Sequence, residues 1–79
     1  MSGDGNNKLV RMANQIADNF DYGDDQDTAV AGVLDHLVRF WTPTMKQTII
    51  EQQKAGDIGL NEIAGKAIEA LAETIGQAA

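Results

Sequence analysis

Apolar side chains recur every three or four residues along most of this chain, in four stretches that glycine or proline separates. This spacing is typical of helices that bury one face. In the first stretch the residues at this spacing are Leu9, Met12, Ala13, Ile16, Ala17 and Phe20. No stretch alternates apolar and polar residues as a strand does, and no hairpin turn signal is present. The sequence therefore predicts an all-α fold.

The N-terminal part combines a polar start with the first helix. Residues 1–7 are rich in Gly, Asn and Asp, so we expect a flexible segment there, followed by a single helical domain over residues 8–79. Asn6 or Asn7 can cap the first helix, because an asparagine side chain accepts a bond from an unpaired helix N–H. The helix should end near Gly23, since glycine suits the left-handed position that follows many helices.

The second helix can be capped by Asp27 or Thr28. Its apolar residues are Val30, Val33, Leu34, Leu37, Phe40 and Trp41. Gly32 interrupts this pattern at a cost of roughly 1 kcal/mol relative to alanine, and it leaves room for a second helix to approach closely. Thr42 is a suitable cap for a third helix, with Pro43 in the first helical position, where the missing N–H does no harm.

The third helix should run to about Lys54 and end at Gly56, and the fourth should begin at a cap from Asn61 and end at Gly76. The third has three large apolar residues, which are Met45, Ile49 and Ile50. The buried residues expected in the fourth are Ile63, Ala64, Ala67, Ile68, Leu71, Ala72 and Ile75. Short connections favour antiparallel neighbours. We therefore expect a small antiparallel bundle of three to four helices.

Composition narrows the range of functions. The formal net charge of −6 repels phosphate backbones, so nucleic-acid binding is not expected. The absence of cysteine excludes disulfides, cysteine-ligated zinc, iron–sulfur ligation and cysteine nucleophiles. No apolar run can span a bilayer, and the first residues lack the basic and apolar regions of a targeting signal. We therefore expect a cytoplasmic chain without membrane contact.

Catalytic and metal-binding patterns are missing from the sequence. The single histidine, His36, has no acid–base or nucleophilic partner near it in the sequence. The acidic run over residues 18–27 resembles a calcium loop in composition alone. Counting from Asp21, Gln26 and Gly32 stand where an EF-hand needs glycine and glutamate, so we expect a solvated turn with capping carboxylates. We predict no catalytic, cofactor-binding or metal-binding residue, and a small enzyme that uses His36 or the acidic run stays as an alternative.

Residues 36–46 form an unusual stretch that holds the only Trp, the only Pro and one of the two Phe residues. Trp, Arg and Met are frequent anchors of protein interfaces. An equally good interpretation is that Phe40 and Trp41 plug one end of the bundle and that Pro43 merely starts a helix. Adjacent side chains on a helix point about 100° apart. Both aromatic rings cannot face one narrow core, and at least one should be partly exposed.

This stretch and residues 8–17 together resemble the delta subunit of cytosolic NAD-dependent formate dehydrogenase. Residues 8–17 read Lys-Leu-Val-Arg-Met-Ala-Asn-Gln-Ile-Ala, as is typical of that family. The later residues that fit are His36, Leu37, Arg39, Phe40, Trp41, Pro43, Met45, Gly59 and Leu60. Val38 departs from a usual basic residue, Thr42 from an acidic one, and Thr44 and Lys46 from arginines. Because lysine lacks the planar fork of arginine, contacts made by those arginines would be weaker here or involve a different partner.

The resemblance implies a non-catalytic accessory subunit that supports assembly or stability of a larger enzyme. In that family the larger subunits carry molybdopterin guanine dinucleotide, iron–sulfur clusters, FMN and the NAD site. We predict contacts with those larger formate dehydrogenase subunits, with Trp41 as the anchor. The predicted contact residues are Arg11, Asn14, His36, Arg39, Trp41, Pro43, Met45 and Lys46. The alternative is a self-associating helical module, unrelated to redox chemistry, that forms a homo-oligomer through Trp41.

Overall fold

The computed structural model describes residues 4–21, 23, 25–56 and 58–78, with the backbone alone described for 4–7 and 76–78. It contains four helices, α1 (Asp4–Phe20), α2 (Gln26–Phe40), α3 (Pro43–Ala55) and α4 (Glu62–Ala78). No strand occurs in the part of the chain that is described. The predicted all-α fold and the helical bundle are confirmed.

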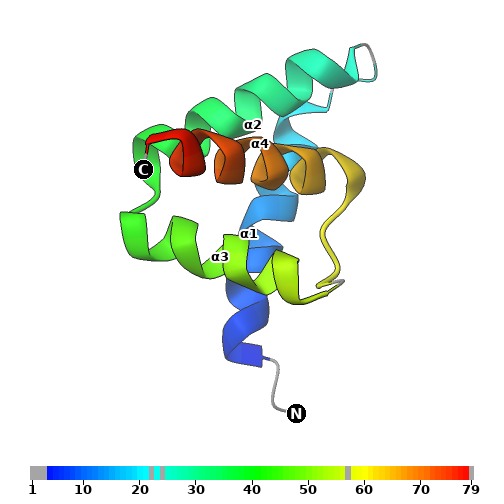
Figure 1. The fold of residues 1–79 in the computed structure, drawn as a ribbon. Helices are drawn as coiled ribbons and strands as arrows, with labels where there is room; N and C mark the ends of the chain where they lie inside the picture. The colour runs from blue at the N-terminus through cyan, green and yellow to red at the C-terminus, as the bar shows by residue number, and fades with distance from the viewer. Residues whose placement is uncertain (1–3, 22, 24, 57, 79) are drawn as a thin grey trace.

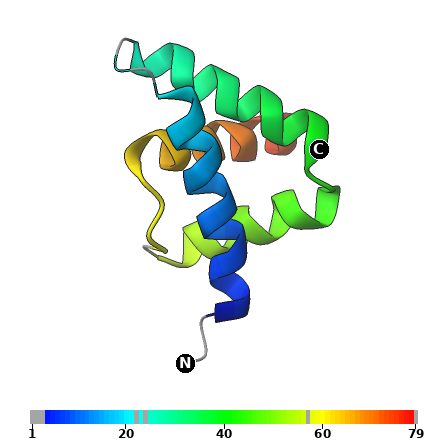
Figure 2. The ribbon, with the colours of Figure 1, turned by 180° about the vertical axis from the view of Figure 1, so that it is seen from behind.

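The four helices pack as a layer of three with the fourth laid across it. In Figure 1, α3 runs in the direction opposite to α2 and α4, and α1 passes behind these three helices. Figure 2 shows the same crossing from the other side, with α1 in front. The consecutive helices α2 and α3 are antiparallel, as are α3 and α4, which agrees with their short connections. The closest partners are α2 and α4, which are separated in sequence and run in the same direction.

The core forms where small and branched side chains of all four helices meet. The buried residues are Val10, Ala13, Ala17, Ala29, Val33, Leu37, Trp41, Ile49, Ile50, Ile63, Ala64, Ala67, Ile68 and Leu71. On α1 the buried line is Val10, Ala13 and Ala17, whereas the larger apolar residues Leu9, Met12, Ile16 and Phe20 are half-buried along one flank. Alanine at the centre of the line lets the helix backbones approach closely, and the larger side chains pack around that contact.

Several predicted helix ends are confirmed. Thr42 Oγ accepts a hydrogen bond from the Met45 N–H at 3.2 Å, and Pro43 occupies the first turn of α3. Asn61 Oδ1 accepts one from the Ala64 N–H at 2.8 Å, which caps α4. Gly23 has the expected left-handed conformation, with a φ of +82°, but α1 ends at Phe20, three residues before it.

The cap of α2 differs from the prediction. Asp25 accepts hydrogen bonds from the Asp27 N–H at 3.0 Å and from the Thr28 hydroxyl at 2.9 Å. Asp27 and Thr28 therefore donate to the cap, and the prediction that either one is the cap is wrong. Asp25 is the N-cap of α2, because a cap residue has an extended backbone directly before the first helical residue. The backbone of Asp25 is extended, and the helix begins at Gln26.

The outer ends of α1 and α4 also differ from the prediction. The helix α1 begins at Asp4, so Asn6 and Asn7 lie inside it and do not cap it. The helix α4 continues through Gly76 to Ala78, because one glycine weakens a helix without ending it when good helix formers, here Gln77 and Ala78, follow. The flexibility of residues 1–7 stays a prediction, and residues 1–3 lie outside the described part.

Gly32 on α2 is in tight contact with Phe20 of α1. A Cβ atom built on Gly32 would lie 2.6 Å from Cδ1 of Phe20 and 2.8 Å from its Cε1. These distances are shorter than real Cβ contacts, so the Phe20 ring occupies the space that a side chain would fill. The prediction that Gly32 lets another helix approach closely is confirmed.

We expect Gly32→Ala to lower the free energy of unfolding by about 1–2 kcal/mol, because overpacking against Phe20 outweighs the gain in helix propensity. Gly65→Ala in α4 is the matched control. Its added Cβ would have Gln53 Nε2 as its nearest neighbour at 3.8 Å, an ordinary contact. We expect that variant to gain up to about 1 kcal/mol. Urea unfolding followed by circular dichroism measures both, and equal gains in the two variants would contradict the tight contact at Gly32.

Candidate partner-binding surface

The chain turns sharply between α2 and α3, and this corner contains most of the predicted contact residues. The helix α2 ends at Phe40, and only Trp41 and Thr42 separate it from Pro43. The Trp41 N–H still donates to Leu37 O at 3.0 Å, while the Trp41 backbone is already extended. Thr42 is the N-cap of α3, which begins at the next residue. The corner is therefore held by one hydrogen bond to the end of α2 and by another at the start of α3.

The two adjacent aromatic residues at the corner have opposite environments. Trp41 is 6% exposed and belongs to the core, whereas Phe40 is 68% exposed. The prediction that at least one ring is partly exposed is confirmed. The choice of Trp41 as an exposed anchor is corrected, because α2 ends before Trp41 and its extended backbone places the side chain in the core. Phe40 is the aromatic residue that a partner can reach.

His36 and Arg39 lie beside Phe40 on α2. The rings of His36 and Phe40 are 4.8 Å apart between centroids and tilted by 45°. Arg39 Nε contacts the Asp35 carboxylate at 3.0 Å, with both side chains about two-thirds exposed. An exposed pair one helical turn apart contributes only about 0.3–0.5 kcal/mol. The Arg39 guanidinium can therefore exchange this carboxylate for another at little cost.

The three predicted contact residues of α3 are used in different ways. Pro43 is exposed, and Met45 is half-buried and packs against the core. Lys46 Nζ donates to Val38 O at 3.3 Å. Lys46 thus pairs with a carbonyl in the last turn of α2, where a cation is favoured by the helix dipole.

On α1, the structure separates the two predicted contact residues. Arg11 is exposed. Asn14 instead holds the segment before α4, since its Nδ2 donates to Gly59 O at 3.0 Å and its Oδ1 accepts from the Asn61 N–H at 2.8 Å. Asn61 Nδ2 also donates to the backbone oxygen of Asn14 at 3.4 Å. Asn14, predicted as a contact residue for a partner, is therefore engaged within the chain, and no local sequence signal indicates partners this far along the chain.

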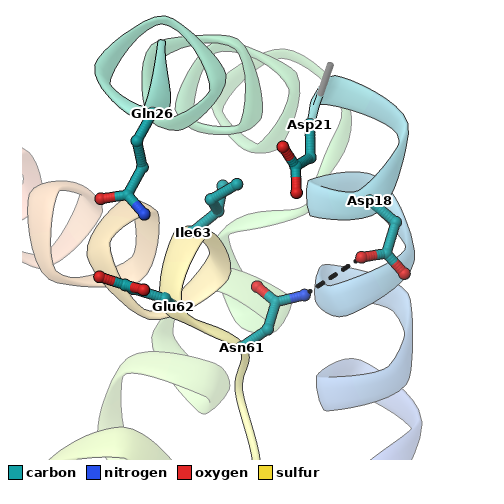
Figure 3. A pocket seen from close by; sticks show the side chains of 6 residues that line it. All are labelled: Asp18, Asp21, Gln26, Asn61, Glu62 and Ile63. Atoms are coloured by element: carbon teal, nitrogen blue, oxygen red, sulfur yellow. Dashed lines mark hydrogen bonds between the residues drawn. The ribbon is translucent and has the colours of Figure 1, made fainter. Parts of the chain in front are cut away.

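A depression of about 250 Å³ lies beside the start of α4, away from the α2–α3 corner. Its lining residues are Asp18, Asp21, Gln26, Asn61, Glu62 and Ile63, shown in Figure 3. Asn61 Nδ2 donates to Asp18 Oδ1 at 3.5 Å across it, and Lys66 binds both Gln26 and Glu62 next to it. Within the described ranges, no three His, Cys, Asp or Glu side chains are placed to hold a metal ion. The depression is an acidic surface feature formed by helix ends.

The described helices also include none that is both long and apolar enough to cross a lipid bilayer.

The model of the NADH-dependent formate dehydrogenase delta subunit family, FdsD, matches residues 8–68. The chain belongs to this family. Neither the curated proteins nor the solved structures contain a match to it. The resemblance found in residues 8–17 and 36–46 is confirmed.

In this delta-subunit chain the family-typical residues divide into two groups. Leu37 and Trp41 are buried, and Asn14 joins α1 to the segment before α4, so these residues maintain the fold. The exposed group consists of Lys8, Arg11, Gln15, Arg39, Phe40, Pro43 and Gly59, with His36 half-buried beside Phe40. The resemblance therefore combines residues that determine the fold with residues that lie at the surface. The second group is accessible at the surface of the folded chain.

Proposed function

We propose that this chain is a non-catalytic subunit that supports assembly or stability of an NAD-dependent molybdenum formate dehydrogenase by binding its larger subunits. The observation that carries the proposal is the family match over residues 8–68. Exposed family-typical side chains at the α2–α3 corner support it, because an exposed phenylalanine next to an arginine is typical of interface anchors. The proposal places the chain in the cytoplasm with those subunits.

In this proposal the redox chemistry belongs to the larger subunits. They carry molybdopterin guanine dinucleotide, iron–sulfur clusters, FMN and the NAD site, whereas this chain contributes binding energy. A partner that binds only the folded form of a subunit stabilises that form by mass action. At a free concentration of about one hundred times the Kd, the gain is about 2.7 kcal/mol. A small helical chain can therefore protect a large subunit without taking part in its reaction.

Removal of this chain from its host tests the proposal. We expect a strain that lacks it to yield less intact formate dehydrogenase, with a lower thermal midpoint and less formate-dependent NAD⁺ reduction per cell. Re-expression of the chain should restore all three quantities. The reciprocal experiment purifies a tagged chain and identifies the proteins that accompany it. An unchanged yield and thermal midpoint in the deletion strain, with no formate dehydrogenase subunit on the tagged chain, would refute the proposal.

A further inference from the structure

Charges are distributed very unevenly along the chain. All 12 acidic residues lie outside residues 8–17 and 36–50, although the net charge is −6. Of the six basic residues, the four inside these two segments are Lys8, Arg11, Arg39 and Lys46. The two segments are therefore locally positive in a strongly acidic protein. A partner that binds here gains from carboxylates of its own.

The two segments also contribute side chains to one face of the molecule. The helices α1 and α2 cross where the Phe20 ring lies against Gly32, and Figure 2 shows them diverging from that crossing. Residues three or four positions apart lie on the same side of a helix. Counting back from Phe20 in such steps gives one row of side chains on α1, and counting forward from Gly32 gives a second row on α2. We name these two rows together the α1–α2 face. It consists of Leu9, Met12 and Ile16 on α1 and of His36 and Phe40 on α2. The α1 row and His36 are half-buried, and Phe40 is the most exposed member.

We propose that the α1–α2 face binds a larger formate dehydrogenase subunit, with Phe40 in an apolar socket whose rim carries carboxylates. This inference rests on the function proposed above and specifies the surface that performs it. Burial of an aromatic side chain removes about 150–250 Å² from water, which makes Phe40 the main apolar contribution. Arg39 exchanges Asp35 for a carboxylate on the rim, since its exposed pair with Asp35 is weak.

The same charges argue against a second copy of this chain as the occupant. A two-fold interface brings the same patch of both copies together. The exposed Arg39 side chains of the two copies would then be brought toward each other, and the carboxylate that lies against each of them, Asp35, is already paired within its own copy. Like charges brought together across an interface are unfavourable. An acidic socket on a different protein satisfies both the exposed Phe40 ring and the neighbouring Arg39.

Phe40→Ala tests the socket. The variant is co-expressed with a tagged catalytic subunit, and the amount of delta-subunit chain retained per catalytic subunit is measured after washing. We expect at least about a tenfold loss, in the range of interface anchors. The matched control is Val38→Ala, which is 47% exposed and lies two residues away, about 160° around the helix. We expect that control to be retained like the wild type, and circular dichroism checks that both variants are folded.

Arg39→Glu tests the rim. We expect several-fold lower retention at low ionic strength, with a difference from the wild type that narrows as salt is raised, because salt screens exposed charges. The control is Lys54→Glu, which changes the net charge equally at the opposite end of α3. Equal losses in both charge variants would show an effect of net charge alone and would overturn the carboxylate rim.

The outcomes separate this inference from the proposed function. If the wild-type chain is retained and Phe40→Ala is retained equally, the socket is refuted while the accessory role stands. If the wild-type chain is not retained by any catalytic subunit, the proposed function fails, and this inference fails with it. If the isolated chain forms a homodimer that Phe40→Ala dissociates, the occupant is a second copy and the acidic partner is refuted.

Discussion

Trp41→Ala is expected to lower the free energy of unfolding by about 3–5 kcal/mol, the usual range for truncation of a buried aromatic residue. Trp41 is 6% exposed and packs in the core at the end where α2 and α3 meet. Its removal leaves a cavity that the tight turn between the two helices cannot close. Because a core of this size supplies only about 3–5 kcal/mol, we expect the variant to lose its cooperative thermal transition in circular dichroism.

The adjacent residue supplies the control. Phe40→Ala removes an aromatic ring of similar chemistry that is 68% exposed, and we expect it to change the free energy of unfolding by no more than about 0.5 kcal/mol. Trp41→Phe keeps an aromatic ring in the core and should recover part of the stability. Comparable losses in Trp41→Ala and Phe40→Ala would contradict the assignment of one ring to the core and the other to the surface. Loss of partner binding in Trp41→Ala then reports unfolding and does not identify a contact.

Asn14→Ala is expected to lower the free energy of unfolding by about 1–3 kcal/mol. The Asn61 N–H would lose its bond to Asn14 Oδ1, and a part-buried donor without a partner has a cost in this range. The loss of the Asn14 bond to Gly59 O would release the segment before α4 from α1. Urea unfolding measures the free energy of unfolding. Hydrogen exchange of the Asn61 amide should become faster than in the wild type, and by a larger factor than exchange of the amides inside α4.

Asn19→Ala is the matched control, because Asn19 is exposed on the same helix. We expect that control to be neutral or slightly stabilising, since alanine is the better helix former. A neutral Asn14→Ala variant would mean that the two hydrogen bonds do not hold the segment. If Asn14→Ala weakened binding to the formate dehydrogenase subunits while stability was unchanged, Asn14 would return to the contact surface, as the sequence first indicated.

Much of the fold follows from local patterns. The apolar spacing predicts all four helices, and Thr42, Pro43 and Asn61 are correctly identified at the starts of α3 and α4. These features depend on side chains within one helical turn of each other, which the sequence displays directly. The wrongly predicted helix ends differ from the structure by only a few residues. Asp25 and Asp27 are equally suitable caps by residue type, and only the backbone conformation distinguishes them.

The candidate site was less predictable, because its residues differ in contacts that are distant in sequence. The family resemblance rests on residues 8–17 and 36–46 within the matched range 8–68, but it does not separate the residues that determine the fold from those at the surface. Asn14 is polar and stands on the side of α1 away from Leu9, which favours an exposed position. Its partners Gly59 and Asn61 are 45 and 47 residues away. No periodicity within one helix contains that information.

The sequence by itself determined an all-α chain, the approximate positions of its helices and the family to which it belongs. Only the tertiary structure decided that Trp41 is buried while Phe40 is exposed, and that Asn14 binds within the chain. The physical reason is the range of the interactions. Helix formation and capping depend on neighbours along the chain, whereas burial of one flank depends on which helices cross it, and that is set by the packing of all four helices together.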